Sequence, residues 1–506
     1  MNLPNIALLA ALSLVFGLLC LWPRTRLLFI AARGPMMLAT SAVAVYWLQT
    51  SSPVRSLDFW LPTASLGLTI IVWAAIHLPN RAQWRAAAAT MALIVAVITV
   101  VALTRYIEPL CCLTPTRPPD IVSVLIGVAI CAGLVAIASV LFRHKARRLN
   151  WLILFIIALF VILKWDVLTQ ALSAALRGLN GQDTLQATAF DVRWLGFSYI
   201  AFRLIHAMRE RVTARPPLPG KPAPPGLSLS EFVTYVVFFP ALTAGPIDRS
   251  ERFARDYRSP AAPQMTDLTD GACRIIAGIF KKFVIADTLA LIALNTVNAA
   301  QVNASGWMWV IVYAYALRIF FDFSGYTDIA IGLGRLFGIK LPENFDRPYL
   351  KPNLTLFWNS WHMTLAQWFR AYYFNPVTRA LRSPKETRFL PAQGFFRQPA
   401  FIILFGQITT MLLIGLWHGI TWNFVAWGAW HAAGLFIHNR WAEFQRKRHA
   451  NDSDGAEPAS APPWRNRLTN TLSIVVTFHF VALGWVWFAL PGIDQSLVVF
   501  RRLLGG

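Results

Sequence analysis

The sequence predicts an all-α, polytopic helical integral membrane protein. Of the 506 residues, 56% are hydrophobic and only 14% are charged, whereas about a quarter are charged in an ordinary soluble domain. Apolar runs of roughly 15 to 22 residues recur along the chain, which is about the length of helix that crosses a 30 Å hydrocarbon core. We expect about 11 or more transmembrane helices, with additional re-entrant and interfacial helices.

The absence of alternating hydrophobicity in these runs excludes the strands of a membrane barrel. The net charge of +22 does not indicate binding to nucleic acid, because the basic residues form short clusters between apolar runs and no single basic surface. Four such clusters lie in alternate loops, and by the positive-inside rule these loops are cytoplasmic and the N-terminus is outside. They contain Arg24, Arg26 and Arg33; Arg81 and Arg85; Arg143, Lys145, Arg147 and Arg148; and Arg209, Arg211, Arg215 and Lys221.

The first part of the chain, residues 1–188, is expected to be a scaffold of transmembrane helices that also forms a lipid-facing wall. The expected helices are 4–22, 35–49, 59–78, 86–104, 121–142 and 149–164. Between Asp166 and Asp191 the chain becomes polar and contains Gly178 and Gly181. This composition predicts a partly external loop.

Residues 189–506 form the second expected region, which begins with a span at about 189–208. The proline-rich segment 215–226 cannot be helical and is expected to be flexible, as is the segment 445–464. The apolar stretch 232–244 is too short to cross a bilayer, so a re-entrant or tilted element is expected there. Longer helices are expected at 270–294, 307–337, 358–374, 401–415 and 471–490.

Four of the nine histidines lie within the segment 321–438 among tryptophan and phenylalanine residues; they are His362, His418, His431 and His438. An ionisable ring at membrane depth costs free energy, so each is a candidate for function. The alternative for each is a packed core histidine whose ring nitrogens bond to neighbouring helices. Sequence spacing alone does not rank His418 above His431.

Other polar and small residues in this region also suggest specific contacts. Asp322 needs a partner if it is buried, and Arg318, one helical turn earlier, is a candidate; a structural ion pair is favoured over direct catalysis. Gly415 and Gly419 share a helix face beside His418, and they allow close approach of another backbone or of a substrate. The five cysteines show no metal-ligand spacing, so no metal site is expected.

Several motifs in fixed order resemble one family. They are 321–328, 342–349, Trp361-His362-Met363-Thr364-Leu365 and 415–419, preceded by 238–240, 244–249 and 281–287. Their order and spacing look like those of the membrane-bound O-acyltransferases, in particular the bacterial branch that includes the alginate O-acetylation and teichoic acid D-alanylation proteins. The resemblance runs from about Gly196 to Gly506, and it implies that 189–506 is the catalytic region, built around a central funnel.

The resemblance also implies which residues form the site. His418 would be the general base, and His362 would line the same funnel as a second catalytic residue. The residues expected to bind substrate are Trp361, Trp417, Asn359, Asp322, Tyr326 and Asn344. Ser360 and Ala371 depart from the family pattern, where Arg and Asp are usual. Because a base and an acid are missing together, recognition of the acceptor or of a partner is expected to differ.

Acyl transfer from a thioester to a hydroxyl needs a base and a donor to the developing oxyanion. Burial disfavours the charged form of histidine, so a buried ring is neutral and able to accept a proton. Aromatic residues around it would exclude water, which otherwise hydrolyses the thioester.

The expected function is transfer of an acyl group, acetyl first, from a cytoplasmic thioester, either acetyl-CoA or an acyl carrier protein. The acceptor would be hydroxyls of an extracytoplasmic polysaccharide or of a relay protein, such as a secreted SGNH-type acetyltransferase partner. No tightly bound cofactor is expected. The protein would lie in the bacterial cytoplasmic (inner) membrane as a multi-pass protein, with membrane lipid as a further partner.

Two alternatives stay open. The first is D-alanyl transfer from a carrier protein to a cell-envelope polymer. The second is a polytopic transporter, which would also explain buried charges and broken spans. Against the transporter, no inverted repeat is visible and the polar positions gather in the second half of the chain.

The alternating basic loops generate a test of topology. A cysteine placed near Lys145 should be shielded from an impermeant thiol reagent in intact cells, whereas one near Arg117 should react, because the two loops are expected on opposite sides. Labelling efficiency of each variant measures this, once native Cys111 and Cys112 have been replaced. The reverse pattern would invert the topology and the side from which the donor enters.

Overall fold

The structure, a computed structural model, describes residues 3–21, 26–107, 112–142, 148–213, 226–259, 264–383, 394–452 and 463–506. These ranges are helical with no strand, which confirms the all-α class. Within them, six helices are long and apolar enough to cross a membrane, and seven if the bent pair α6 (Leu149–Lys164) and α7 (Asp166–Leu179) is one span. The larger number of spans stays a prediction.

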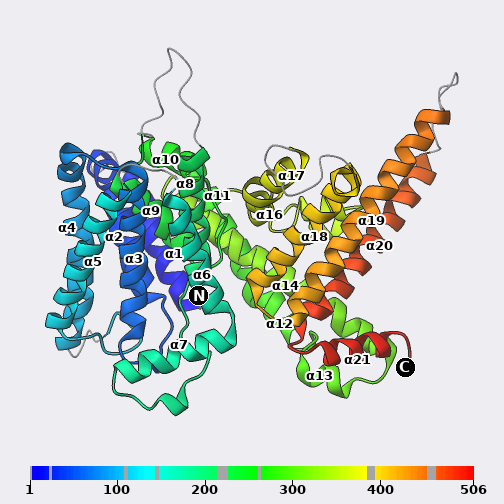
Figure 1. Ribbon diagram of the computed structural model, residues 1–506, viewed down its shortest axis with the longest axis horizontal. Coiled ribbons are helices and arrows are strands. Elements are labelled where there is room, and N and C mark those ends of the chain that lie inside the picture. Colours follow the sequence, from blue (N-terminus) through cyan, green and yellow to red (C-terminus); the bar gives the residue numbers. More distant parts are fainter. Residues whose placement is uncertain are drawn as a thin grey trace. The chain divides into compact units, whose positions relative to one another are not determined.

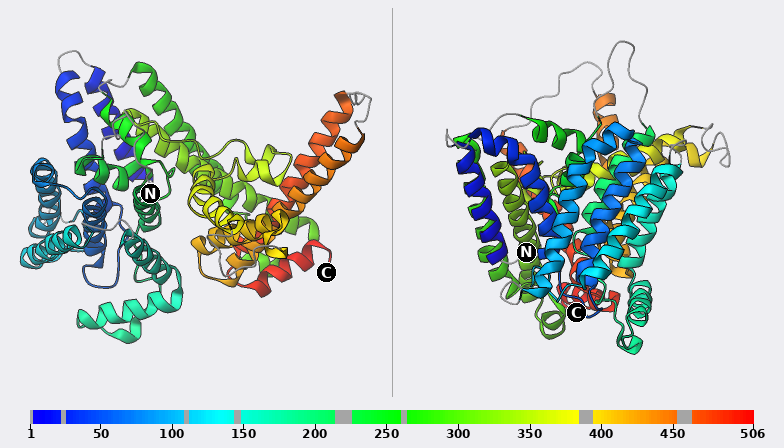
Figure 2. Two further views of the ribbon diagram at one scale, coloured as in Figure 1. Left: turned by 45° about the horizontal axis from the view of Figure 1, so that its top comes forward. Right: turned by 90° about the vertical axis from the view of Figure 1, so that its left-hand side faces the viewer.

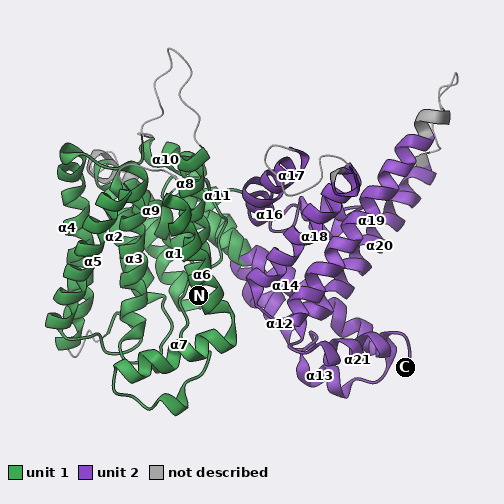
Figure 3. Cartoon of the chain, in the orientation of Figure 1, with its two compact units in different colours: residues 1–278, 326–342 green, residues 279–325, 343–506 purple. Residues whose placement is uncertain are grey.

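The described chain divides into two compact units (Figure 3). Unit 1 comprises residues 1–278 and 326–342, and unit 2 comprises residues 279–325 and 343–506. Helix α14 (Ser305–Leu336) contributes its first part to unit 2 and its last part to unit 1. The predicted division of labour between 1–188 and 189–506 concerns function and stays a prediction.

Unit 1 contains all of the helices expected in the first part of the chain (Figures 1 and 2). Their starts follow local rules: Asn80 and Gln83 form a capping box at the start of α4, and the side chain of Asp120 accepts a hydrogen bond at the start of α5. The bounds in this unit are α1 (Leu3–Leu21), α2 (Arg26–Trp47), α3 (Leu57–His77), α4 (Arg81–Leu103), α5 (Ile121–Leu141), α8 (Phe197–Thr213), α9 (Leu229–Val237), α10 (Ser250–Arg258) and α11 (Met265–Ile279).

The expected polar loop between Asp166 and Asp191 is wrong in its first half, where the chain forms α7. This helix is bent by 93° from α6, and Figure 1 shows it running across the ends of neighbouring helices. The buried Asp191 holds the following loop to it, since its carboxylate accepts from Ser173 at 2.7 Å and pairs with Arg177 at 2.9 Å. Burial alone would raise the pKa of Asp191, but hydrogen bonds from Thr188, Ser173 and Arg177 lower it to about 2.

The short apolar element expected at 232–244 is present as α9 followed by a 3₁₀ turn, Phe239–Ala241. The break between them leaves carbonyl groups without helical partners. The buried guanidinium of Arg203 supplies those partners, donating to the carbonyl oxygens of Val236 at 2.7 Å and Ala241 at 2.8 Å. A broken helix is thereby tolerated in the protein interior.

Unit 2 holds the tryptophan- and histidine-rich segments. The helix expected at 358–374 is wrong as one element, because the chain leaves the helical conformation between α15 and α16 and passes through a π-helical turn at Arg370–Phe374. Helix α19 continues to Asp452, so residues 445–452 are helical; residues 453–462, like 214–225, lie outside the described residues. The bounds are α12 (Asp287–Ala290), α13 (Thr296–Gln301), α15 (Leu354–Trp358), α16 (Met363–Phe369), α17 (Asn375–Arg382), α18 (Pro399–His418), α19 (Trp422–Asp452), α20 (Pro463–Ala489) and α21 (Ile493–Leu503).

Helices α18 and α19 form a close antiparallel pair through glycines, and α20 lies beside α19 (Figures 1 and 2). A Cβ atom at Gly415 would overlap the carbonyl oxygen of Phe424 on α19, and one at Gly428 would lie 2.7 Å from the carbonyl oxygen of Met411 on α18. The predicted close approach of another backbone is confirmed at Gly415, whereas Gly419 lies beyond the end of α18, where a Cβ would be 2.7 Å from the Phe424 ring. The helix pair therefore fixes where His418, the last residue of α18, is placed.

This contact predicts that Gly415→Ala destabilises the protein by about 1–3 kcal/mol, because the added methyl group must push two backbones apart. The measurement is the thermal unfolding temperature in detergent. The matched control is Gly133→Ala, since a Cβ at Gly133 meets nothing within 4 Å and a helical Gly→Ala change should stabilise slightly. Equal unfolding temperatures for the two variants would contradict the close packing.

Candidate active site

A small cavity in unit 2 is lined by two of the four candidate histidines. Its volume is about 40 Å³, and α14, α15, α16, α18, α19 and α20 all contribute to its wall. The lining residues are Ile319, Phe323, Trp358, Trp361, His362, Leu365, Ile414, His418, Trp427, Trp485 and Phe488. Apart from the two imidazoles and the indole N–H groups, this wall is entirely apolar. We call it the catalytic cavity, after the roles that the sequence resemblance implies for its two histidines.

His362 sits at the break between α15 and α16, with left-handed backbone angles of φ 42° and ψ 53°. Few residues other than glycine adopt this conformation, which costs of order 1–3 kcal/mol and persists where the surroundings enforce it. Here the enforcement comes from Asn344, whose backbone carbonyl accepts from Met363 N–H at 2.9 Å. The side-chain oxygen of Asn344 accepts from the backbone N–H and the hydroxyl of Thr364, at 3.2 and 2.8 Å.

The same Asn344 oxygen lies 3.1 Å from Nδ1 of the buried His362 ring. Because the Thr364 N–H donates to this Asn344 atom, it is an acceptor, and Nδ1 of His362 must therefore carry the proton. In the neutral ring this leaves a lone pair on Nε2, which is buried and has no hydrogen-bond partner in the described chain. His362 thus presents a proton acceptor beside the cavity that it lines.

His418 is surrounded by aromatic rings at the end of α18. Its ring centroid lies 4.4 Å from that of Trp417, 4.8 Å from that of Phe488 and 5.9 Å from that of Phe424. The Trp417 ring is in turn 6.1 Å from the His362 ring. Trp417 therefore contacts both histidines, although Trp361, and not Trp417, lines the cavity.

The other histidines of the region lie away from the catalytic cavity. His431 is fully buried behind it, 5.1 Å from the Trp358 ring and 4.9 Å from the Trp427 ring between centroids. A Cβ at Gly484 on α20 would lie 2.7 Å from Nε2 of His431. His438 meets the hydroxyl of Thr355 at 3.1 Å. The structure thus distinguishes His418 from His431, which the sequence alone could not do.

A second, larger cavity of about 170 Å³ adjoins the catalytic one, since Trp358 and Ile414 line both. Its wall carries amide, hydroxyl and guanidinium groups, so we call it the polar cavity. Asn359 lies in this cavity and accepts a hydrogen bond from Arg370 at 2.6 Å. The complete lining is Thr355, Trp358, Asn359, Ala366, Arg370, Phe374, Gln407, Thr410, Met411, Ile414, Leu435 and Asn439.

Four of the predicted substrate-binding residues line neither cavity: Trp417 and Asn344, described above, and Asp322 and Tyr326. Asp322 forms an ion pair with Lys282, so the partner suggested by the sequence, Arg318, is not the one in the structure; the side chain of Asp322 is 48% exposed. Tyr326 belongs to unit 1, where its buried hydroxyl bonds to the hydroxyl of Thr243.

Sequence reasoning missed several residues of the catalytic cavity. Trp485 and Phe488 come from α20, which the sequence indicated only as a final span, and Ile319 and Ile414 carry no polar signal. Among the residues that the structure describes, no group of three or more His, Cys, Asp or Glu side chains is arranged to hold a metal ion.

Comparison with known proteins identifies the family to which the chain is similar. The membrane-bound O-acyltransferase family, MBOAT, matches residues 140–393, a range that includes His362 and ends before His418. The chain is 32% identical over 317 residues to the teichoic acid D-alanyltransferase of Streptococcus thermophilus, covering 61% of this chain and 71% of that protein.

Two further relatives carry different names. The peptidoglycan O-acetyltransferase of Helicobacter pylori is 31% identical over 303 residues, which are 59% of this chain and 51% of that protein. The probable alginate O-acetylase of Pseudomonas aeruginosa is 34% identical over 276 residues, 54% of this chain and 46% of that protein. The chain thus spans about half the length of these two relatives.

The family match extends over half of the chain, and the relatives are acyltransferases by name. The apolar helices independently indicate a multi-pass membrane protein. The protein therefore belongs to the membrane-bound O-acyltransferase family and is an acyltransferase.

Proposed function

We propose that the protein transfers a small acyl group, acetyl first, from a cytoplasmic thioester to hydroxyls of an extracytoplasmic polysaccharide or of a relay protein. The observation that carries this proposal is the catalytic cavity itself, which is small, mostly apolar and lined by His362 and His418. Its small volume, about 40 Å³, favours a small acyl group such as acetyl over a long acyl chain.

In this proposal His418 takes the proton of the attacking hydroxyl, the role implied by the family resemblance. His362 has a different task, because its proton is committed to Asn344 and only the Nε2 lone pair faces other groups. It accepts a hydrogen bond from a group that enters the cavity, and so positions that group. A neutral ring held in this tautomer cannot donate to the oxyanion.

Oxyanion stabilisation must come from other donors. The indole N–H group of Trp427, in the cavity lining, is buried without a hydrogen-bond partner in the described residues. It is available to the thioester carbonyl as negative charge develops there. The surrounding rings exclude water, which protects the thioester from hydrolysis.

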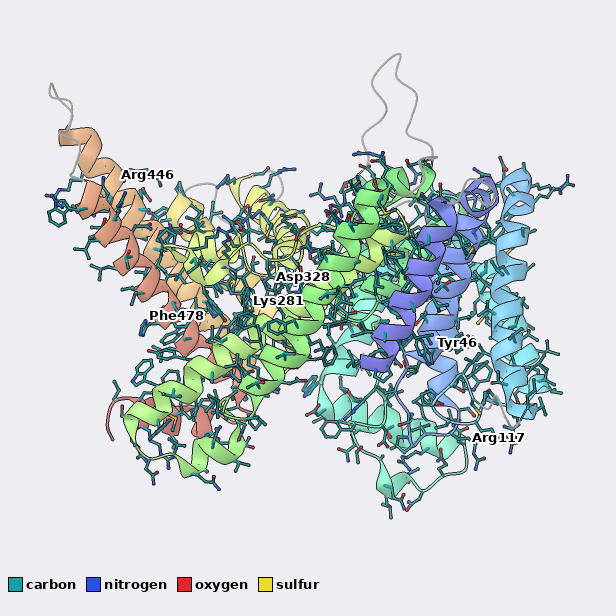
Figure 4. All side chains as sticks on the ribbon, turned by 180° about the vertical axis from the view of Figure 1, so that it is seen from behind. Tyr46, Arg117, Lys281, Asp328, Arg446 and Phe478 are labelled. Atoms are coloured by element: carbon teal, nitrogen blue, oxygen red, sulfur yellow. The ribbon has the colours of Figure 1, made fainter. Side chains whose placement is uncertain are left out.

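The polar cavity supports entry of the donor from the cytoplasm. Gln407 on α18 and Asn439 on α19 line this cavity. Both lie closer than His418 does to the end of the helix pair where α18 begins and α19 ends. That end is basic on α19, where Arg446 is found (Figure 4), and basic ends are cytoplasmic by the positive-inside rule. A donor arriving from this side meets the polar cavity before the histidines.

The remaining parts of the proposal follow from the reaction. The donor is acetyl-CoA or an acyl carrier protein, and no tightly bound cofactor is needed. The acceptor is a polysaccharide or an SGNH-type partner outside, and the chain lies in the bacterial inner membrane with lipid around it. Asn359 contributes to substrate binding from the polar cavity, where its side chain is held by Arg370.

A second candidate, D-alanyl transfer, is favoured by one feature. The catalytic cavity is walled by aromatic rings, and such rings attract an ammonium group through cation–π interaction. Two relatives are also named teichoic acid D-alanyltransferase. Supplying purified protein with acetyl and D-alanyl thioesters in parallel decides between the two, and acetyl transfer alone is expected.

The histidine roles give the first test of the proposal. His418→Ala should lower acyl transfer at least 10²-fold, because general-base catalysis contributes about 10²–10⁴ in rate, while the protein stays in the membrane at normal levels. His362→Ala should cause a large but smaller loss. Acceptor acylation by membranes of each variant measures both. Wild-type-like acylation by His418→Ala would remove this histidine from catalysis.

The contact between Asn344 and His362 gives a second test. Asn344→Leu should lower kcat of acyl transfer about tenfold or more, because the His362 ring loses the acceptor that fixes its tautomer. Asn344→Asp should retain more activity, since its carboxylate accepts the same hydrogen bonds and the replaced Nδ2 group has no partner in the described chain. If the two variants had equal kcat, Asn344 would have no positioning role.

A further inference from the structure

Trp358 occupies an unusual place, because its indole lines both cavities of unit 2. It is the last residue of the short helix α15 and is followed directly by the non-helical residues 359–362. Its ring packs edge-on against Trp427, at 5.7 Å between centroids, and against His431 at 5.1 Å. With Ile414, it forms the wall between the polar and the catalytic cavity.

The indole is held by packing alone. Its Nε1–H is buried and has no hydrogen-bond partner among the described residues, which is a costly state for a donor. On the wall of the polar cavity, Oε1 of Gln407 is likewise buried without a partner in the described chain. A donor and an acceptor, both unsatisfied, thus border the same cavity.

An indole turned toward the polar cavity, with its N–H within reach of Gln407, would satisfy both groups with one hydrogen bond. It would also remove the wall between the two cavities, of about 170 and 40 Å³. Ring contacts stabilise the packed position of the indole, and the hydrogen bond would stabilise the turned position. The indole therefore has two alternative positions, each with its own stabilising contact.

We propose that Trp358 is a movable partition between the polar and catalytic cavities, and that Gln407 stabilises its open position. On the basis of the proposed function, the indole in its closed position keeps water away from His362 and His418 until the arm of a thioester donor enters the polar cavity. Trp358 therefore controls the access of water and of the donor to His362 and His418.

Accessibility of the catalytic cavity tests the partition without any assay of activity. Leu365 lines only the catalytic cavity and is 2% exposed, so Leu365→Cys reports entry in a background without native cysteines. A small charged methanethiosulfonate is added from the cytoplasmic side of inside-out vesicles. Labelling should become at least tenfold faster when Trp358→Ala is added, and also faster with the milder Trp358→Leu.

Gln407 provides the second arm. With Trp358 intact, Gln407→Met should slow labelling of Leu365→Cys about fivefold, the factor that corresponds to one ordinary hydrogen bond. Two matched controls should leave the rate unchanged: Thr409→Val, on the same helix but outside both linings, and Trp309→Ala, a tryptophan of α14 that lines neither cavity. Unchanged labelling in both Trp358 variants, or in Gln407→Met, overturns the proposal.

A third measurement separates this inference from the proposed function. In purified protein with an acyl thioester, Trp358→Ala should raise the ratio of thioester hydrolysis to acyl transfer severalfold, whereas Trp309→Ala should not. If labelling changes as expected but the thioester is neither hydrolysed nor transferred by the unmodified protein, the partition stands and the proposed donor is wrong. If the thioester reacts but the hydrolysis ratio is unchanged, the partition is wrong and the function stands.

Discussion

The structure depends on one constraint: backbone polar groups in a membrane interior must find partners within the protein. Continuous helices meet it by themselves, and breaks do not. At two of the breaks, single residues supply the partners. Arg203 bonds to carbonyl groups at the end of α9 and in the turn that follows it, and Asn344 holds the backbone around His362. The irregular backbone that presents His362 exists because Asn344 compensates for it.

Around this break the protein builds a shell of rings. Phe323 meets His362 edge-on at 4.7 Å between centroids, and Trp361 lies 5.0 Å from Trp485. Such rings are large and rigid, so they fill the space around the cavity and leave little room for water. An apolar shell also strengthens each remaining polar interaction, which suits a reaction in which charge develops on one oxygen.

The sequence predicted the helices well where apolar runs are long, because length and hydropathy are local properties. The sequence-based prediction failed at 358–374. The break there is imposed by Asn344, which is 20 residues before its partner Thr364, so only the folded structure shows the contact. The prediction also missed α7, a helix in a polar stretch. For the site, motifs located His362 and His418, while Trp485 and Phe488 carry no motif, and the ion-pair partner of Asp322 comes from a separate segment.

The contact between Gly484 and His431 has a consequence for how this protein can vary. Nε2 of His431 lies 2.7 Å from where a Cβ of residue 484 would stand, and the edge of Trp430 lies 3.1 Å from the same point. A side chain at 484 therefore requires the His431 ring to shift or to be replaced by a smaller side chain. Among homologous sequences, these two positions should change together, and a graft of α20 that brings a larger residue to position 484 should be tolerated better when position 431 is exchanged with it.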